Sequence, residues 1–410
     1  DFHESKVEFE RVCKWKWHLY KAAFSRFKET PPPQEYKVFV DENDNWLRDY
    51  CTYRAIKDQM EEVPWTQWPM ELKNREPAAI QAFQQQHQDL MELYAFLQYT
   101  FFAQWQDVRQ EFNRAGIRII GDMPIFAAHD SADVWSNPTL FQLDHEGNPT
   151  VLAGVPPDYY SISGQRWGNP HYQWHHMKAD DFLWWRKRIQ GMLTHVDVIR
   201  IDHFRGLEAY WEIDAKAKTA VNGRWVKAPG KELFAALEKH LGKLPLIAED
   251  LGMITPEVEA LKHAYQLPGM KILQFSFGRK LHKKMRPAHY EKHTFAYTGT
   301  HDNDTLAGWI QEVASKKKEI ADNLSHYHQI DLNEPVDQVC WQLIELLMNT
   351  NAGAVIIPFQ DYLCLDNEAR MNHPGTIGGE NWRWRCSRAN LRDPALMKRI
   401  LEVTRNSNRF

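Results

Sequence analysis

Three apolar segments of the sequence end in charged or ionisable side chains. The segments are VDVIRID (196–202), LPLIAED (244–250) and TFAYTGTHD (294–302), and the residues at their ends are Arg200, Asp202, Glu249, Asp250, His301 and Asp302. Charged side chains are costly to bury unless they are paired or used in chemistry. The ends of these segments are therefore the first places to look for a functional site.

The segment 196–202 has the apolar composition of a buried β-strand. Side chains alternate across a strand, so Arg200 and Asp202 would share one face, at the end of the strand. Two charges on the face of a buried strand are costly unless they are paired or used, so the pair is a candidate for a functional site. The alternative is a structural salt bridge that caps the strand.

Enzymes that cleave glycosidic bonds with retention use carboxylates of the kind found at these strand ends, here together with an arginine and a histidine. One carboxylate attacks the anomeric carbon, and a second carboxyl group, about 5–5.5 Å away, donates its proton to the leaving oxygen. The proton donor needs a raised pKa, which burial and nearby negative charge supply. The carboxylates at the three strand ends, Asp202, Glu249, Asp250 and Asp302, are the candidates for these two roles. Glu249 alone could equally be a structural residue, but three such strand ends together favour catalysis.

A metal site is the rival interpretation. His301, Asp302 and Asp304 could ligate a divalent ion, and His203 directly follows Asp202. However, the sequence has no HExxH motif, and the histidines do not cluster with these carboxylates at metal-ligand spacing. We therefore expect neither a metal ion nor a cofactor.

Six short apolar runs, alternating with helical stretches after residue 116, form the frame that would position these residues. They are IRIIGDMPIF (117–126), VDVIRID (196–202), LPLIAED (244–250), MKILQFSF (270–277), TFAYTGTHD (294–302) and GAVIIPFQD (353–361). Strands alternating with helices indicate a parallel sheet. Polar residues at the carboxyl ends of the strands are typical of a TIM barrel, which builds its active site there. A doubly wound sheet is the alternative, but the sequence lacks a GxGxxG or Walker A phosphate loop.

A TIM barrel has eight strands, and the sequence shows six. The chain opens with Asp1, and we expect the first two strands in a segment outside this sequence. Residues 1–110 are predicted to be a helical subdomain inserted in the barrel, and residues 111–410 to be the catalytic barrel. The helices are expected over 6–27, 45–60 and 80–112, with a break at the PPP of 31–33 and a stop at Gly116. The wide apolar stripe of 80–112 favours packing within the domain over a coiled-coil partner.

Two insertions and a late segment carry further candidates for substrate binding. The loop 153–174, AGVPPDYYSISGQRWGNPHYQW, is long enough to be a lid, with rings to stack on sugars and polar groups to bind hydroxyls. Its candidate residues are Asp158, Tyr159, Gln165 and Trp167. Residues 209–230 contain Asn222-Gly223, which predicts a β-hairpin at the mouth of the barrel. The segment ARMNHPG (369–375) adds Asn372, which would either bind substrate or cap the last strand.

The composition excludes several other classes of protein. The chain has 410 residues, a net charge of −4 and a pI near 6.6, which argues against a nucleic-acid or anionic-membrane binder. No apolar run approaches the roughly 20 residues that span a bilayer. Five widely spaced cysteines without a CxxC motif indicate reduced thiols and a cytoplasm-like compartment. The 13% aromatic content suits a sugar-binding cleft, although core packing also explains it.

The motifs GVPPDY, GQRWGNP, IRIDHFRG, IAEDLG, YTGTHDND and ARMN-PG occur in this order. Together they resemble the amylomaltases, or 4-α-glucanotransferases (disproportionating enzymes), which are relatives of the α-amylases. The resemblance runs from about residue 110 to the end, and the helical first third is similar to the family's helical subdomain. It implies a TIM barrel that transfers α-1,4-glucan segments between malto-oligosaccharides, in a bacterial cytoplasm or a plastid. It implies no oligomeric state.

The resemblance also implies roles for individual residues. Asp202 would be the nucleophile, and Glu249 the general acid and then the base. Asp302 and His301 would hold the distorted donor sugar through its hydroxyls, and Arg200 would keep Asp202 ionised. The remaining residues expected to contact or border the substrate are Asp122, Asp158, Tyr159, Gln165, Trp167, Asp250 and Asn372.

Two other functions remain open from the residues themselves. A retaining α-glucan hydrolase shares the chemistry up to the glucosyl-enzyme and differs in whether water or a sugar hydroxyl completes the reaction. A non-catalytic glucan-binding protein would bind glucan without turnover. The products formed from maltotriose distinguish the three.

Overall fold

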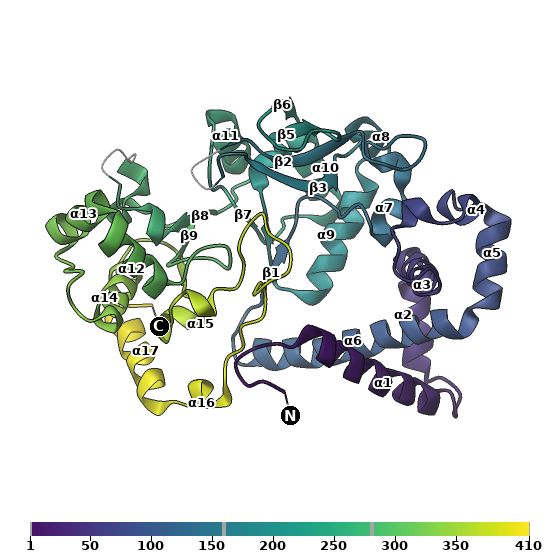
Figure 1. Ribbon diagram of the computed structural model, residues 1–410, viewed down its shortest axis with the longest axis horizontal. Coiled ribbons are helices and arrows are strands. Elements are labelled where there is room, and N and C mark those ends of the chain that lie inside the picture. Colours follow the sequence, from purple (N-terminus) through teal and green to yellow (C-terminus); the bar gives the residue numbers. More distant parts are fainter. Residues whose placement is uncertain (1, 158–160, 279–282, 410) are drawn as a thin grey trace. The chain divides into compact units, whose positions relative to one another are not determined.

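The structure, a computed structural model, describes residues 2–157, 161–278 and 283–409. The chain divides into two compact units. Unit I comprises residues 15–250 and 254–265, and unit II comprises residues 1–14, 251–253 and 266–410. Each unit contains a three-stranded parallel sheet with helices packed beside it (Figure 1).

The helices of the first third form one side of unit I. They are α1 (Phe9–Phe27), whose first residues belong to unit II, α2 (Gln34–Glu42), α3 (Asp44–Gln59), α4 (Met70–Lys73), α5 (Pro77–Gln86) and α6 (Gln88–Arg114). Leu47 and Cys51 of α3 pack against Tyr94 of α6 in a small apolar core. The helices expected over 6–27 and 45–60 are confirmed. The single helix expected over 80–112 is two helices that meet at His87, and α2 was not predicted.

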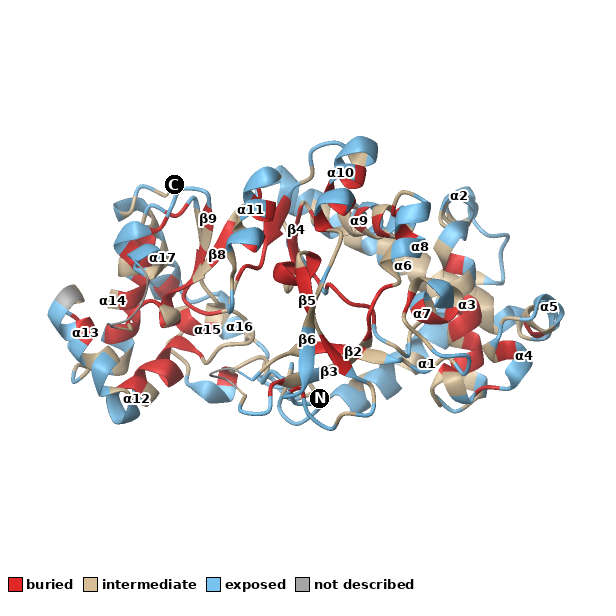
Figure 2. Ribbon diagram, turned by 90° about the horizontal axis from the view of Figure 1, so that it is seen from above, coloured by how far each residue is buried: buried red, intermediate tan, exposed pale blue. Residues whose placement is uncertain are grey.

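The parallel sheet of unit I has the order β1-β4-β7. Its strands are β1 (Ile120–Met123), β4 (Val198–Ile201) and β7 (Leu246–Ala248). The helix α9 (Leu183–His195) leads into β4 and contacts both β1 and β4 (Figure 1). The helix α10 (Gly230–Leu241) packs against α9 and leads into β7. Every residue of β4 is buried, as Figure 2 shows, so an ionised group on this strand must be paired or used.

A second, antiparallel sheet in unit I has the order β3-β2-β5-β6. Its strands are β2 (Val151–Val155), β3 (Gln165–Pro170), β5 (Ala209–Asp214) and β6 (Gly223–Lys227), and β6 is the largely exposed edge (Figure 2). The prediction of one continuous loop over 153–174 was therefore wrong, because β2 and β3 flank a shorter connection. A Cβ on Gly154 would lie 2.0 Å from the carbonyl oxygen of Gln165, so a glycine that resembles a loop residue serves close strand pairing. Asp158 and Tyr159 lie outside the described residues.

Shorter helices complete unit I. They are α7 (Ala132–Ser136), α8 (Trp174–Ala179) and α11 (Pro256–Ala264). The Ser131 hydroxyl caps α7 by accepting a hydrogen bond from the backbone N–H of Val134. A 3-10 turn over Phe204–Leu207 directly follows the end of β4.

The parallel sheet of unit II has the order β10-β9-β8. Its elements are β8 (Gly269–Ile272), β9 (Thr294–Tyr297), β10 (Ala354–Ile356), α12 (Leu306–Lys316), α13 (Lys318–His328), α14 (Val336–Met348), α15 (Phe359–Tyr362), α16 (Arg388–Leu391) and α17 (Pro394–Asn406). A large apolar core joins β9, α12, α14 and α17. The loop between β9 and α12 carries His301 and Asp302, so this core supports candidate site residues.

All six strands expected from the apolar runs are present, and the α/β class is confirmed. The strands of the two three-stranded sheets run parallel, as expected. Closure into an eight-stranded barrel and the domain limits at residues 110 and 111 stay predictions. Among the residues that the structure describes, no helix is long and apolar enough to cross a membrane.

Candidate active site

Arg200 joins two carboxylates at the carboxyl end of the unit I parallel sheet. The register pairs Asp122 of β1 with Arg200 of β4. Nη1 of Arg200 donates to Oδ1 of Asp122 at 2.6 Å and to Oδ1 of Asp202 at 2.9 Å. Burial lowers the pKa of Arg200, but the charges of Asp122, Asp202 and Glu249 outweigh it and raise the pKa above its ordinary value. The guanidinium therefore remains a permanent cation among carboxylates.

Asp202 and Glu249 stand at the ends of adjacent strands and differ in exposure. Ile201 of β4 is paired with Ala248 of β7, and the N–H of Glu249 donates to the carbonyl oxygen of Ile201 at 3.1 Å. The Asp202 side chain is 43% exposed, whereas Glu249 is 8% exposed. One carboxylate is thus open to a ligand while its neighbour is largely shielded from water.

The backbone of His203 donates a hydrogen bond to Glu249. It adopts a left-handed conformation with φ of 52°, and its N–H donates to Oε2 of Glu249 at 2.8 Å. Burial lowers the pKa of its imidazole to about 3, with help from the charge of Arg205, so the ring is neutral. The ring of Trp167 meets it edge-on at 5.0 Å between centroids. The sequence suggested His203 only as a metal ligand. Within the described ranges, no three His, Cys, Asp or Glu side chains gather to hold a metal ion.

The other candidates of unit I have protein partners. Asp250 is buried and accepts a hydrogen bond from Nζ of Lys262, which also pairs with Glu259. Oε1 of Gln165 accepts from Nε1 of Trp167 at 3.1 Å. The hydrogen bond between Gln165 and Trp167 holds the two side chains together, and the ring of Trp167 lies against His203. The contact with Lys262 joins the carboxylate of Asp250 to α11. A role in substrate binding stays a prediction for all three candidates.

In unit II, Asp302 is held by two neighbours. Nδ2 of Asn372 donates to Oδ1 of Asp302 at 2.6 Å, and Nε2 of His301 lies 3.3 Å from Oδ2 of the same carboxylate. The N–H of Asn372 also donates to the carbonyl oxygen of His301 at 3.0 Å. The structure therefore brings together His301, Asp302 and Asn372, which the sequence singled out separately.

Arg370 is a member of this group that the sequence analysis did not select. It donates to the carbonyl oxygen of Asp302 at 2.7 Å, to Oδ1 of Asp304 at 2.5 Å and to the carbonyl oxygen of Asn372 at 2.8 Å. One guanidinium thus joins the loop after β9 to the segment that contains Asn372. The signal was present in the ARMN motif, but nothing in the sequence showed which loop this arginine contacts.

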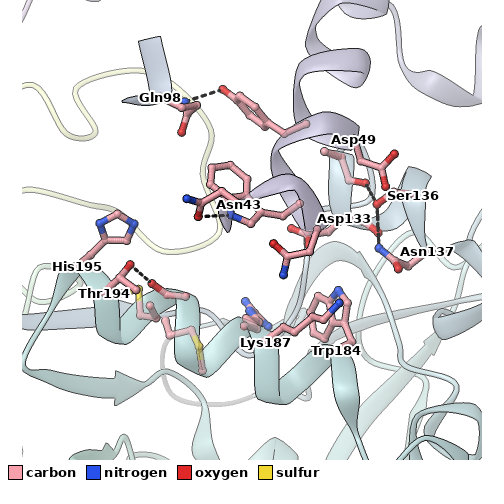
Figure 3. A pocket seen from close by; sticks show the side chains of 18 of the residues that line it. Asn43, Asp49, Gln98, Asp133, Ser136, Asn137, Trp184, Lys187, Thr194 and His195 are labelled. Carbon is pink, nitrogen blue, oxygen red and sulfur yellow. Dashed lines mark hydrogen bonds between the residues drawn. The ribbon is translucent and has the colours of Figure 1, made fainter. Parts of the chain in front are cut away.

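A pocket of about 640 Å³ in unit I reaches Asp122 (Figure 3). Asn43 and Asp49, at the start of α3 and within it, line one side, and Trp184 and Lys187 of α9 line the other. The pocket also contacts Met123, so it runs beside β1, which is an edge strand of its sheet. Its mixture of rings, amides and carboxylates continues the polar surroundings of Arg200.

Comparison with known proteins decides the family. The sequence profile described as 4-alpha-glucanotransferase matches residues 1–391. The chain belongs to the 4-α-glucanotransferase family. It is 45% identical over 389 residues to the 4-α-glucanotransferase of Thermus thermophilus, covering 94% of this chain and 77% of that one. The family and the activity predicted from the motifs are confirmed.

Further 4-α-glucanotransferases support the assignment. The chloroplastic/amyloplastic enzyme of Solanum tuberosum is 41% identical over 341 residues, covering 83% of this chain and 58% of its own length. Among solved structures, the amylomaltase from Streptococcus agalactiae in complex with acarbose matches with a TM-score of 0.93 and 35% identity. That match covers 100% of this chain and 81% of the other. The α/β fold of this 4-α-glucanotransferase is therefore that of an amylomaltase.

Proposed function

We propose that this 4-α-glucanotransferase moves α-1,4-glucan segments between malto-oligosaccharides by double displacement, with Asp202 as nucleophile and Glu249 as acid and base. The observation that carries this proposal is the contrast between the two strand ends. Arg200 donates to an accessible Asp202 at 2.9 Å, while Glu249 beside it is shielded from water. A charged nucleophile and a shielded proton donor on adjacent strands are the two parts that retaining chemistry needs.

The reaction has two balanced steps. In the first, a carboxylate oxygen of Asp202 bonds to the anomeric carbon, and the glycosidic bond breaks as Glu249 gives its proton to the leaving oxygen. In the second, Glu249 takes the proton of an acceptor's 4-hydroxyl, whose oxygen bonds to the anomeric carbon and releases Asp202. The configuration is inverted twice and therefore retained.

The group around Asp302 supplies transition-state binding in this proposal. Positive charge develops at the anomeric centre, and hydrogen bonds to sugar hydroxyls strengthen as the ring distorts. Asp302 accepts such hydrogen bonds, while Asn372 and His301 keep its carboxylate oriented. The amylomaltase of Streptococcus agalactiae was solved with acarbose. We infer that this chain binds an oligosaccharide of similar shape through these groups.

Other candidates would bind the glucan chain on either side of the reacting bond. The ring of Trp167 is suited to stack on a sugar, and the amide of Gln165 to bind a hydroxyl. Asp122 and Asp250 would act at the edge of the site. For Asp158 and Tyr159 the support comes from the sequence resemblance alone.

The fold proposal is the TIM barrel that the sequence predicts. Its support is the match to an amylomaltase and the free edge of β1, beside which the pocket of Figure 3 lies. A further strand, expected in a segment outside this sequence, would pair with that edge in a closed barrel. In a protein that includes that segment, slow hydrogen exchange at the β1 amides that do not bond to β4 would support closure, and fast exchange there would contradict it.

The compartment proposed is a reducing one, either a bacterial cytoplasm or a plastid. Its support is the five free cysteines and the bacterial and plastid origins of the relatives.

Incubation with maltotriose alone tests the function. The transferase should give glucose plus a ladder of longer chains, with constant reducing ends. Glucose and maltose with steadily rising reducing ends would instead show a hydrolase. Binding of maltotriose without turnover would show a glucan-binding protein, and the D202N variant provides the inactive control.

A further inference from the structure

The loop that carries His301 and Asp302 is attached at both of its ends to one buried carboxylate. Thr298, directly after β9, donates from Oγ1 to Oδ2 of Asp361 at 2.5 Å. The N–H of Leu306, the first residue of α12, donates to Oδ1 of Asp361 at 2.8 Å. Asp361 is 1% exposed, in the short helix α15. One side chain thus fixes both the exit and the return of the loop.

We propose that Asp361 is a positioning residue of the transferase, which sets the 298–306 loop so that Asp302 presents its carboxylate to the donor sugar. This inference rests on the proposed role of Asp302. Asp361 acts through the loop and does not itself touch the sugar, because it is 1% exposed.

A second side chain, that of Asn367, also holds the base of the loop. Oδ1 of Asn367 accepts from the N–H of Thr305 at 3.1 Å. A Cβ on Gly308 would lie 2.4 Å from the side chain of Asn367, so the first turn of α12 packs closely against it. The start of α12 is therefore held by two side chains that lie six residues apart in one segment.

The same segment also holds the tip of the loop. Arg370 binds the carbonyl oxygen of Asp302 and the carboxylate of Asp304, and Asn372 binds the carboxylate of Asp302. Residues 361–372 therefore contact the loop from its base to its catalytic side chain. If the base of the loop at Thr298 and Leu306 shifted, the backbone that carries Asp302 would shift with it. Because Arg370 and Asn372 still hold the tip, the shift would tilt the carboxylate of Asp302.

The cost of burying Asp361 supports a specific purpose. Burial raises its pKa to about 6, although the hydrogen bonds from Leu306 and Thr298 oppose that rise. An apolar residue at this buried place would avoid the cost of desolvating a carboxylate. What an apolar residue cannot do is accept two hydrogen bonds from the two ends of a loop.

The decisive comparison is Asp361→Ala with Asp361→Asn. Asparagine keeps an oxygen for the N–H of Leu306 and offers an N–H to the hydroxyl oxygen of Thr298, so both attachments survive without the charge. Alanine removes both. We expect kcat for maltotriose disproportionation to fall about 10- to 100-fold in D361A, with a much smaller change in KM, and D361N to retain most of kcat.

Thr298→Val tests the same attachment from its other end with an isosteric side chain, in case D361A folds poorly. It should lower kcat in the same direction but less, since Leu306 remains attached. Thr294→Val, a like substitution at the start of β9, is the matched control and should leave kcat unchanged. Each rate is divided by the fraction of protein that a fluorinated glucosyl donor traps covalently at completion, so that unfolded protein does not count.

A purely structural role would lower the trapped fraction and leave kcat per trapped site unchanged, and this result would overturn the proposal. A loss in D361N as large as in D361A would also overturn it, because both attachments are retained in D361N. Failure of the proposed function is visible separately. In that case Asp302→Ala would keep wild-type turnover in the same assay, whatever the Asp361 variants do.

Discussion

Arg200 donates from Nη1 to Oδ1 of Asp202 at 2.9 Å, and both side chains lie at the same end of β4. The same nitrogen donates to Asp122 on the neighbouring strand. A buried cation between two carboxylates places a positive charge beside Asp202 and also orients its carboxylate. Orientation and charge therefore come from one guanidinium, and each can be tested by substitution.

Arg200→Lys should lower kcat/KM for maltotriose about 100-fold. Lysine keeps the positive charge but lacks the planar group that reaches Asp122 and Asp202 together, so the nucleophile loses its orientation. Arg224→Lys is the matched control, because Arg224, on the exposed strand β6, is itself largely exposed and pairs with Glu212 of β5. Wild-type activity in Arg200→Lys would show that charge alone is sufficient.

Asp202→Asn and Glu249→Gln should each reduce turnover of maltotriose by at least about 10³-fold, because one removes the nucleophile and the other the proton donor. They should differ with α-glucosyl fluoride, whose leaving group needs no proton. Glu249→Gln should then accumulate a glucosyl-enzyme, seen by mass spectrometry as an added sugar on a peptide that contains Asp202. The same adduct in Asp202→Asn would show that another residue is the nucleophile.

Asn372→Leu should lower kcat about 10- to 100-fold, since Asp302 loses the amide that donates to its Oδ1 at 2.6 Å. The carboxylate would then be free to rotate away from the sugar. Asn349→Leu, at the exposed end of α14, is the control for replacing an amide with an apolar group. Equal rates for wild type and Asn372→Leu would mean that His301 alone is sufficient to orient Asp302.

The sequence predicted the strands well because each contains a short apolar run between helical stretches. It also predicted the contact between Arg200 and Asp202, since the alternation of a strand alone places them on one face. It did not predict the helix break at His87, because the apolar period continues from α5 into α6. It misjudged 153–174, where glycine and proline suggested a loop although Gly154 lies in a strand.

The unpredicted parts of the candidate site depend on contacts between distant segments. Arg370 reaches Asp304, 66 residues earlier in the chain, and no periodicity connects the two. His203 acts through its backbone N–H, which side-chain chemistry does not reveal. Asp361 closed an apolar run in the sequence just as Asp202 did, and only the structure shows that one is accessible while the other is buried beneath a loop.

Asp361 should also make stability depend on pH. Burial raises its pKa to about 6 from an ordinary value of 3.8. Between about pH 4 and 6 the folded protein therefore holds a proton that the unfolded chain releases. Its contribution to the free energy of unfolding falls as pH rises through this window, and the penalty is complete above pH 6. A shift of about two units corresponds to about 3 kcal/mol.

Asp361→Asn removes the titrating group, so its free energy of unfolding relative to wild type should increase by about 2 kcal/mol between pH 4 and pH 7. Denaturant unfolding at both pH values measures this difference, and any fixed effect of the weaker hydrogen bonds cancels in the comparison. Glu402→Gln, at an exposed position on α17, is the control for replacing a carboxylate with an amide. A difference that stayed constant with pH would mean that Asp361 titrates as an ordinary carboxylate, and that its burial imposes no electrostatic cost on the fold.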